Sequence, residues 1–185
     1  KYLYDYNVEE ASDMMRSPNW TRAIFVRNPK DRFLSVYAEM SRNPRQVRNQ
    51  CCRKDPGCES QTKTMVRFLD LVHSCKSAHW KPQSHRMESH YWEYMNFIGQ
   101  LETVEADSER LLKQIGAWEE VGATGWGPNG GERIFAPDEH AMDSVRYAMA
   151  KYTPVVDRLL DEIYKEDYEN KLFNFPQKVS TLISH

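Results

Sequence analysis

Two short apolar runs stand out against the amphipathic pattern of the rest of the chain. Residues 22–27 place four apolar residues between two arginines, which predicts a strand buried on both faces, as in a parallel sheet. Residues 96–101 have a similar character and predict a second buried strand. Apolar residues at helical spacing follow each run, so the pattern predicts an α/β fold whose mainly parallel sheet is flanked by helices.

Helix signals mark the segments around these strands. After the first strand, Asn28 suits an N-cap and Pro29 suits the first helical position, which predicts a helix that runs to about Met40. The other helices are predicted at 8–16, at 65–72, at 103–115 with Thr103 as the cap, from near Pro137, and from Thr153-Pro154.

Two polar stretches interrupt this pattern. Residues 41–61 are rich in arginine and cysteine, and we expect a loop or an insertion there. Residues 122–136 are predicted to form a Gly-rich loop, because five glycines are spread over 122–131. This loop is either a lid over a ligand or a plain surface connection. The whole chain, 1–185, has a length that suits one domain with one core, and we expect a single, partial domain.

Composition and charge narrow the range of partners. Hydrophobic residues make up 40% of the chain and charged residues 28%, as in soluble globular proteins. The net charge is −2, so nothing global points to nucleic acid. The apolar runs are too short for a transmembrane span or a signal peptide. Because the chain starts at Lys1, we expect a fragment or a processed domain, whose membrane anchor, if the full protein has one, lies upstream.

Four cysteines cluster around the polar stretch 41–61. They are Cys51, Cys52, Cys58 and Cys75. They allow three pairings, of which the one joining the neighbours Cys51 and Cys52 is sterically poor. Disulfides in an oxidising compartment are the preferred interpretation. A zinc site that includes His73 is a weaker alternative because the spacing is not that of a CxxC pair, and free thiols remain a third.

The first strand and the helix after it carry the clearest chemistry. Ligands usually meet a parallel sheet at the carboxyl ends of its strands, where Arg27 lies. A guanidinium offers a planar fork of donors that suits phosphate, and Ser35 adds a hydroxyl from the helix. Periodicity alone favours a plainer interpretation, in which Arg27 pairs with a carboxylate and Ser35 is an ordinary helix serine.

Residues 23–37 resemble a known motif. They read Ala-Ile-Phe-Val-Arg-Asn-Pro-Lys-Asp-Arg-Phe-Leu-Ser-Val-Tyr, which is similar to the 3′-phosphate-binding motif of the sulfotransferases. The resemblance implies that Arg27 and Ser35 bind the 3′-phosphate of the donor 3′-phosphoadenosine 5′-phosphosulfate (PAPS), which leaves as adenosine 3′,5′-bisphosphate. The family usually has Asp where this chain has Asn28, and both residues cap helices well.

Three further blocks follow in the family's order. Residues 79–83 resemble a His-Trp-x-Pro segment, residues 94–107 resemble a Tyr-x-Phe-Ile-Gly-x-x-Glu strand with its following helix, and residues 163–168 resemble a closing Ile-Tyr-x-x-Asp-Phe. Together they point to the carbohydrate (Golgi-type, sulfotransferase family 2-like) branch. The resemblance implies a P-loop-like sulfotransferase fold and an enzyme that transfers a sulfuryl group from PAPS to a hydroxyl of a glycan. It also implies a membrane glycoprotein of the Golgi lumen or secretory pathway.

One family feature is missing from the chain. Family members hold the 5′-phosphosulfate with an earlier strand–loop–helix that is rich in small residues and carries a Lys, so that backbone amides surround the phosphate. Residues 1–21 contain no Gly and only Lys1. We therefore expect the N-terminal part of the domain to lie upstream or to be lost.

The base and the acceptor site are open questions at this stage. His79 is the first candidate for the catalytic base because its pKa range suits proton transfer near neutral pH, with His85 and His90 as weaker candidates. Trp80, Lys81 and Arg86 are candidates for binding the acceptor, since rings stack on sugars and cations bind acidic groups. The alternatives are a structural His79 and an ordinary solvated basic surface. No metal is expected.

Three other functions compete with the enzyme. The missing loop favours an inactive sulfotransferase-like binding module. A different nucleotide-dependent transferase, such as a small kinase, would need a GxxxxGK[ST] sequence, which this chain lacks. A nucleic-acid binder would use the basic residues between Arg42 and Lys54, but the net charge argues against it.

Overall fold

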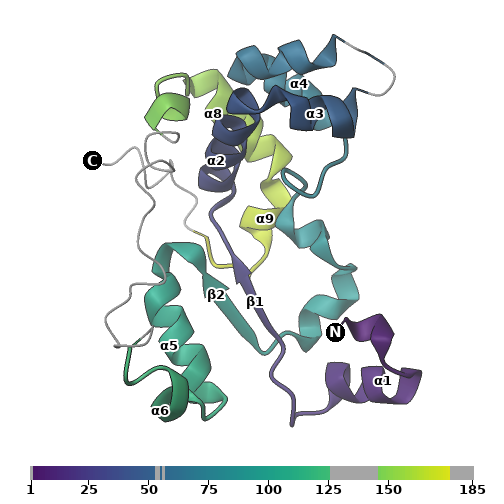
Figure 1. Cartoon of the computed structure of the whole chain (residues 1–185), viewed down its shortest axis with the longest axis vertical. Helices are drawn as coiled ribbons and strands as arrows, with labels where there is room; N and C mark the ends of the chain where they lie inside the picture. The colour runs from purple at the N-terminus through teal and green to yellow at the C-terminus, as the bar shows by residue number, and fades with distance from the viewer. Residues whose placement is uncertain (1, 53–54, 56, 126–145, 176–185) are drawn as a thin grey trace. The chain divides into compact units, whose positions relative to one another are not determined.

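The computed structural model describes residues 2–52, 55, 57–125 and 146–175. They form two compact units, each built from two stretches of the chain (Figure 1). Unit 1 comprises Lys1–Val26 with Met87–Phe135, and unit 2 comprises Arg27–Arg86 with Ala136–His185. The chain therefore leaves unit 1 directly after the first predicted strand. The single-domain prediction stays a prediction, and the two units are described separately below.

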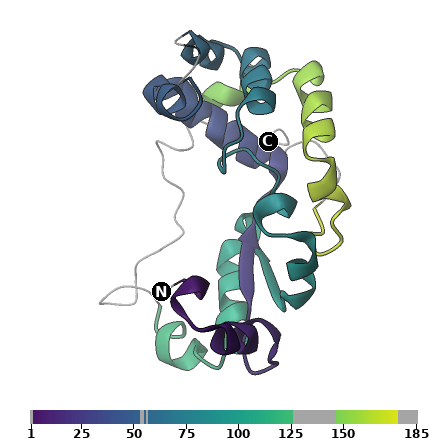
Figure 2. The ribbon, with the colours of Figure 1, turned by 90° about the vertical axis from the view of Figure 1, so that its right-hand side faces the viewer.

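Unit 1 is organised around a pair of parallel strands. Strand β1 (Ala23–Val26) pairs with β2 (Phe97–Gln100) in a register that sets Phe25 opposite Gly99. Helix α5 (Val104–Gln114) packs on this pair, as the side view in Figure 2 shows. The unit also contains η1 (Leu3–Asp5), α1 (Val8–Arg16), η4 (Ser89–Tyr94), η5 (Leu101–Thr103) and α6 (Trp118–Val121).

Unit 2 is helical in its described part. Helix α2 (Pro29–Arg42) follows β1 and packs against α3 (Pro44–Cys51) and α8 (Pro154–Ile163). The remaining elements are η2 (Cys58–Lys63), α4 (Met65–Ser74), η3 (Gln83–Arg86) and α9 (Lys165–Glu169), and residues 146–149 are also helical. The buried core contains the predicted apolar face of α2, namely Phe33, Leu34, Tyr37 and Met40.

The predicted α/β class is confirmed only in part. Both predicted strands form and they are parallel, but within the described residues the sheet has two strands and the structure is mostly helical. The prediction rested on the alternation of strands and helices along the chain, which is typical of a mainly parallel sheet flanked by helices. The described residues instead place most of their helices around the core of unit 2.

Local capping signals were reliable. Asn28 accepts a hydrogen bond from the backbone N–H of Lys30, and Thr153 accepts one from Val156, as the predicted N-caps of α2 and α8 require. Thr103 is an exception: it occupies the N-cap position of α5, but its hydroxyl donates to the carboxylate of Asp107.

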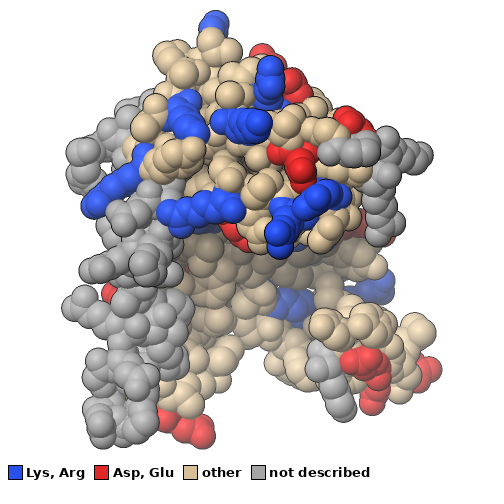
Figure 3. Space-filling model, turned by 45° about the horizontal axis from the view of Figure 1, so that its top comes forward, with Lys and Arg blue, Asp and Glu red and all other residues tan. Residues whose placement is uncertain are grey.

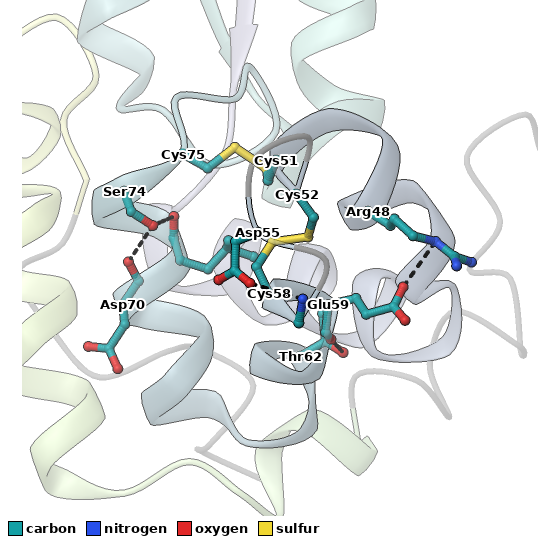
Figure 4. The surroundings of a disulfide bond; sticks show 12 residues. Arg48, Cys51, Cys52, Asp55, Cys58, Glu59, Thr62, Asp70, Ser74 and Cys75 are labelled. Carbon is teal, nitrogen blue, oxygen red and sulfur yellow. Dashed lines mark hydrogen bonds and ion pairs between the residues drawn. A yellow bond between two sulfur atoms is a disulfide. The ribbon is translucent and has the colours of Figure 1, made fainter.

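The stretch 41–61 is not a simple loop. Helix α2 continues to Arg42, and α3 occupies much of the stretch because Pro44 starts a helix that buries only Val47. Disulfides Cys51–Cys75 and Cys52–Cys58 hold α3 to the end of α4 and to η2 (Figure 4). The prediction of disulfides is thereby confirmed, and the pairing avoids the neighbouring cysteines.

Two predictions concern residues outside the described part of the chain, wholly or in part. The helix predicted to start near Pro137 and residues 126–136 of the Gly-rich loop lie outside the described residues, while residues 122–125 form a turn after α6. Among the described helices, none has the length and apolar character needed to cross a membrane.

Candidate functional site

Arg27 and Ser35 lie in direct contact. Arg27 is the first residue after β1, and Ser35 lies on the less buried side of α2. The Nη1 of Arg27 donates a hydrogen bond of 2.8 Å to the Oγ of Ser35. The structure thus brings together the two residues that the sequence predicted for phosphate binding. The first turn of α2 contributes its N-terminal dipole, which favours an anion near the same turn.

The main chain of Arg27 is held by a side chain from a distant part of unit 2. The Oε1 of Gln83 accepts a hydrogen bond of 2.9 Å from the N–H of Arg27, and its Nε2 donates one of 2.7 Å to the carbonyl of Arg27. Gln83 is only 7% exposed. Sequence reasoning did not select this residue, although it ends the His-Trp-x-Pro-Gln block quoted above.

Asp167 of α9 and Tyr164, which lies between α8 and α9, hold the segment that carries Gln83. The carboxylate of Asp167 accepts hydrogen bonds from the backbone N–H groups of Gln83 (2.9 Å) and Ser84 (2.7 Å). The hydroxyl of Tyr164 donates to the carbonyl of Trp80 at 2.9 Å. Burial raises the pKa of Tyr164, so its hydroxyl stays protonated and remains a donor.

Lys30 has a structural role beside the candidate site. Its buried ammonium lies 2.7 Å from one carboxylate oxygen of Asp157 and 2.7 Å from one of Asp161, both on α8. Burial opposes the ionised form of Asp157, but hydrogen bonds from Lys30 and Tyr152 outweigh it, and the pKa of Asp157 is lowered. The ion pairs fix the first turn of α2 to α8.

Arg32 is also engaged with the protein. Its Nη1 and Nη2 donate hydrogen bonds of 2.8 Å to the carbonyls of Lys81 and Ala78. Burial lowers the pKa of Arg32, and the guanidinium stays charged at neutral pH. Arg32 therefore joins α2 to segment 78–81 rather than facing a ligand.

A pocket of about 710 Å³ lies beside segment 75–85. Its walls come from the end of α4, from this segment and from α8. The residues that line it are Val72, His73, Cys75, Lys76, Ser77, Ala78, Trp80, Lys81, Pro82, His85 and Ile163. Apolar walls with a few cations suit a ligand of sugar size that carries polar groups.

The predicted acceptor residues are distributed unevenly around this pocket. Lys81 is exposed and lines it, whereas Arg86 donates a hydrogen bond to the carbonyl of Ala78. Trp80 lines the pocket but is only 2% exposed, packs edge-on against Phe68 and donates its indole N–H to the carbonyl of Cys75 at 2.7 Å. This burial does not fit a ring face that stacks on a sugar, and we assign Trp80 to the core.

The histidine candidates lie in different surroundings. His79 is half-buried, and within the described residues its ring nitrogens have no hydrogen-bond partner. The Nε2 of His85 lies 2.5 Å from the carboxylate of Glu166, so a carboxylate already orients that ring. His90 belongs to unit 1, where it lies 3.6 Å from Glu88. His79 therefore remains the first candidate for the base.

Charge and metal chemistry add little to the site. Figure 3 shows Lys and Arg side chains interspersed with Asp and Glu side chains on the face that it presents. Among the residues that the structure describes, no group of three or more His, Cys, Asp and Glu could hold a metal ion.

Comparisons with known proteins agree with the sequence motifs. Residues 1–176 match the Sulfotransferase family. The chain is 25% identical to human (Homo sapiens) "Carbohydrate sulfotransferase 9" over 180 residues, which cover 86% of this chain and 38% of that relative. The chain therefore spans well under half the length of that relative. No solved structure matches the chain.

Proposed function

The chain belongs to the sulfotransferase family, and from this premise we propose that it is part of an enzyme that transfers the sulfuryl group of PAPS to a hydroxyl of a carbohydrate. The observation that carries the proposal is the hydrogen-bonded pair of Arg27 and Ser35 at the end of β1. The similarity to a carbohydrate sulfotransferase supports a glycan as the acceptor. The two disulfides support maturation in the secretory pathway and, with that similarity, a Golgi location.

Arg27 and Ser35 bind the 3′-phosphate in this proposal. When the phosphate arrives, the guanidinium of Arg27 turns part of its donor fork from Ser35 to the phosphate oxygens, and the hydroxyl of Ser35 donates to the same group. A hydrogen bond between a charged donor and an anion is worth about 1.5–3 kcal/mol. The pair thus accounts for a preference of about 10- to 100-fold for nucleotides that carry the 3′-phosphate.

The acceptor approaches from the pocket beside segment 75–85. Lys81 at the rim, with Arg86 close by in the sequence, supplies positive charge for polar groups of the sugar. Sulfuryl transfer needs the acceptor hydroxyl in line with the sulfur and a base that removes its proton. We assign that base to His79, whose ring has no hydrogen-bond partner among the described residues. The P-loop-like fold and the contacts to the 5′-phosphosulfate belong to the same proposal for the whole protein.

The decisive measurement is a thermal-shift titration with adenosine 3′,5′-bisphosphate, with AMP as the matched nucleotide without a 3′-phosphate. At a hundredfold excess over Kd the bisphosphate should raise the free energy of unfolding by about 2.7 kcal/mol. For a chain of 185 residues this corresponds to an increase in Tm of roughly 5–10 °C. AMP should shift Tm much less.

Two substitutions locate the effect. Arg27→Ala should abolish the difference between the two nucleotides, and Ser35→Ala should reduce it. Arg45→Ala on α3 is the matched control, since Arg45 is an exposed arginine of the same unit with no described partner. Equal stabilisation by both nucleotides would replace the proposal with a different nucleotide-dependent enzyme. A bisphosphate effect that survives Arg27→Ala would remove the assigned site.

A further inference from the structure

We propose that Gln83 and Asp167 are positioning residues for the 3′-phosphate site, acting in series on the main chain of Arg27. The inference rests on the proposed function, because it assigns these residues to the same phosphate. The two residues lie 56 and 140 positions after Arg27 in the sequence and belong with it to unit 2. They fix the position of the backbone from which the side chain of Arg27 extends. Arg27 and Ser35 themselves contact the ligand.

The amide of Gln83 takes the place of a neighbouring strand. A residue in a sheet donates its N–H to the next strand and accepts from it through its C=O. At Arg27, directly after β1, both of these bonds go to the one amide group, at 2.9 and 2.7 Å. The amide therefore extends the geometry of β1 by one residue and fixes the direction in which the side chain of Arg27 leaves the backbone.

Asp167 fixes Gln83 in turn. Its side chain is fully buried, and its two oxygens accept separately from the N–H groups of Gln83 and Ser84. This bidentate contact sets the start of η3, from which the Gln83 side chain reaches Arg27. A carboxylate is the one side chain that offers two acceptor oxygens and no donor in this geometry.

A parallel contact links α9 to the turn after Arg27. The hydroxyl of Tyr168 lies 3.3 Å from the Oδ1 of Asn28, the oxygen that caps α2. Burial raises the pKa of Tyr168, so the hydroxyl stays protonated and donates. Helix α9 therefore supports residues 27 and 28 by two independent routes. Segment 163–168, which resembles the family's closing motif, gains a physical role through these contacts.

The consequence for binding is specific. Hydrogen bonds weaken steeply when their distance or angle departs from the preferred geometry, so a displaced guanidinium loses part of its contact with a phosphate even when the group itself is intact. Loss of the Gln83 contact should therefore weaken binding of the 3′-phosphate and leave the rest of the nucleotide's interactions in place. A purely structural residue would lower Tm without changing the preference between two nucleotides.

The test uses isosteric substitutions and the ratio of two affinities. Gln83→Glu keeps the size and the acceptor for the N–H of Arg27, but it places an oxygen against the carbonyl of Arg27. Asp167→Asn places an NH₂ group against a backbone N–H. Calorimetric Kd values for adenosine 3′,5′-bisphosphate and AMP are measured well below Tm, with circular dichroism confirming the fold. Gln50→Glu and Asp70→Asn, at exposed positions of unit 2, are the matched controls.

The preference for the bisphosphate should fall in Gln83→Glu and in Asp167→Asn, at most by the roughly 10- to 100-fold that the phosphate contacts contribute, and it should not change in the controls. In an Arg27→Ala background, Gln83→Glu should cause no further loss of the preference for the bisphosphate, because the two residues act through one contact. An unchanged preference in the folded Gln83→Glu variant would overturn the inference alone. Failure of the unsubstituted chain to distinguish the two nucleotides would overturn the proposed function, and this inference with it.

Discussion

The carboxyl ends of the two parallel strands are held in contrasting ways. After β1, the main chain of Arg27 is bonded to Gln83, which depends on Asp167 a further 84 residues along the chain. At the end of β2, the N–H of Gln100 donates to the carboxylate of Asp107, only seven residues away, at 2.7 Å. Asp167 is fully buried, whereas the side chain of Asp107 is 14% exposed and that of its partner Arg110 is 53% exposed.

The difference shows two ways to fix a strand end. The support after β1 is buried and comes from distant parts of the chain, so removing one member leaves donors or acceptors with no water to replace it. The support after β2 is local and partly hydrated, so its loss is repaired cheaply by solvent. We therefore expect stability to depend strongly on contacts between distant residues of unit 2 and weakly on the polar contacts around β2.

The largest effect should come from the disulfide that joins distant residues of unit 2, and the other disulfide serves as the local comparison. The Cys51–Cys75 bond spans 24 residues and the Cys52–Cys58 bond spans 6. In the chain-entropy model, removing the first as Cys51→Ala/Cys75→Ala costs about 3.4 kcal/mol, and removing the second as Cys52→Ala/Cys58→Ala costs about 2.2 kcal/mol. Urea unfolding of each double variant measures both. A larger loss from the shorter loop would contradict the importance of contacts between distant residues.

A matched pair of lysines should separate buried from exposed ion pairs. Lys30 is buried against two aspartates of α8, and Lys113 pairs with Glu109 four residues earlier on the surface of α5. Lys30→Met should cost about 3 kcal/mol, the low end for a broken buried pair because Asp157 and Asp161 both reach solvent. Lys113→Met should cost about 0.3–0.5 kcal/mol. Equal losses by denaturant titration would remove the distinction.

Phe25 and Gly99 of unit 1 form an apolar contact between distant residues, which should behave unlike the polar contacts around β2. A methyl group on Gly99 would lie 2.5 Å from a ring carbon of Phe25, the residue opposite it in the strand pair. Gly99→Ala should therefore cost about 1–2 kcal/mol through overpacking. The cost should disappear in a Phe25→Ala background, which a double-mutant cycle of unfolding free energies would reveal. Persistence of the cost would assign it to the backbone instead.

The smallest effect should be on acid stability. Burial opposes ionisation of Asp107, but hydrogen bonds from Gln100, Arg110 and Thr103 outweigh it and hold its pKa below the ordinary value of 3.8. The resulting stabilisation is complete above the unfolded-state pKa and is lost as pH falls through the lower folded-state pKa. Asp107→Asn should therefore flatten the stability profile below about pH 4 and cost less than about 1 kcal/mol at pH 7. An unchanged acid limb would contradict the assignment.

Local signals in the sequence predicted much of the fold. The bounds of α1 match the predicted segment, both strands form where predicted, and Thr153-Pro154 marks the start of α8. These features depend on a few neighbouring residues. The helix α3 was missed because its single buried residue, Val47, leaves no apolar periodicity. The helix predicted over 103–115 ends at Gln114, and Ile115 after it is 50% exposed.

Within the candidate site, the sequence predicted only the residues whose role a family motif implies. Arg27 and Ser35 were selected by the resemblance of residues 23–37, and the structure brings them within 2.8 Å. Gln83 and Asp167 were not selected, because no spacing rule connects residues that lie 84 positions apart. The disulfide pairing was likewise open until the structure showed which cysteines face each other. Contacts between distant residues arise when the core packs, and no short stretch of the sequence shows which residues will meet there.

The amide of Gln83 also has a consequence for self-association. An unpaired strand edge is a template on which another chain can add a strand, and proteins protect such edges against aggregation. At Arg27 the N–H and the C=O that an incoming strand would need are already bonded to Gln83. The residue proposed to orient the phosphate ligand thereby also makes the main chain of Arg27 unavailable to a second copy of the chain.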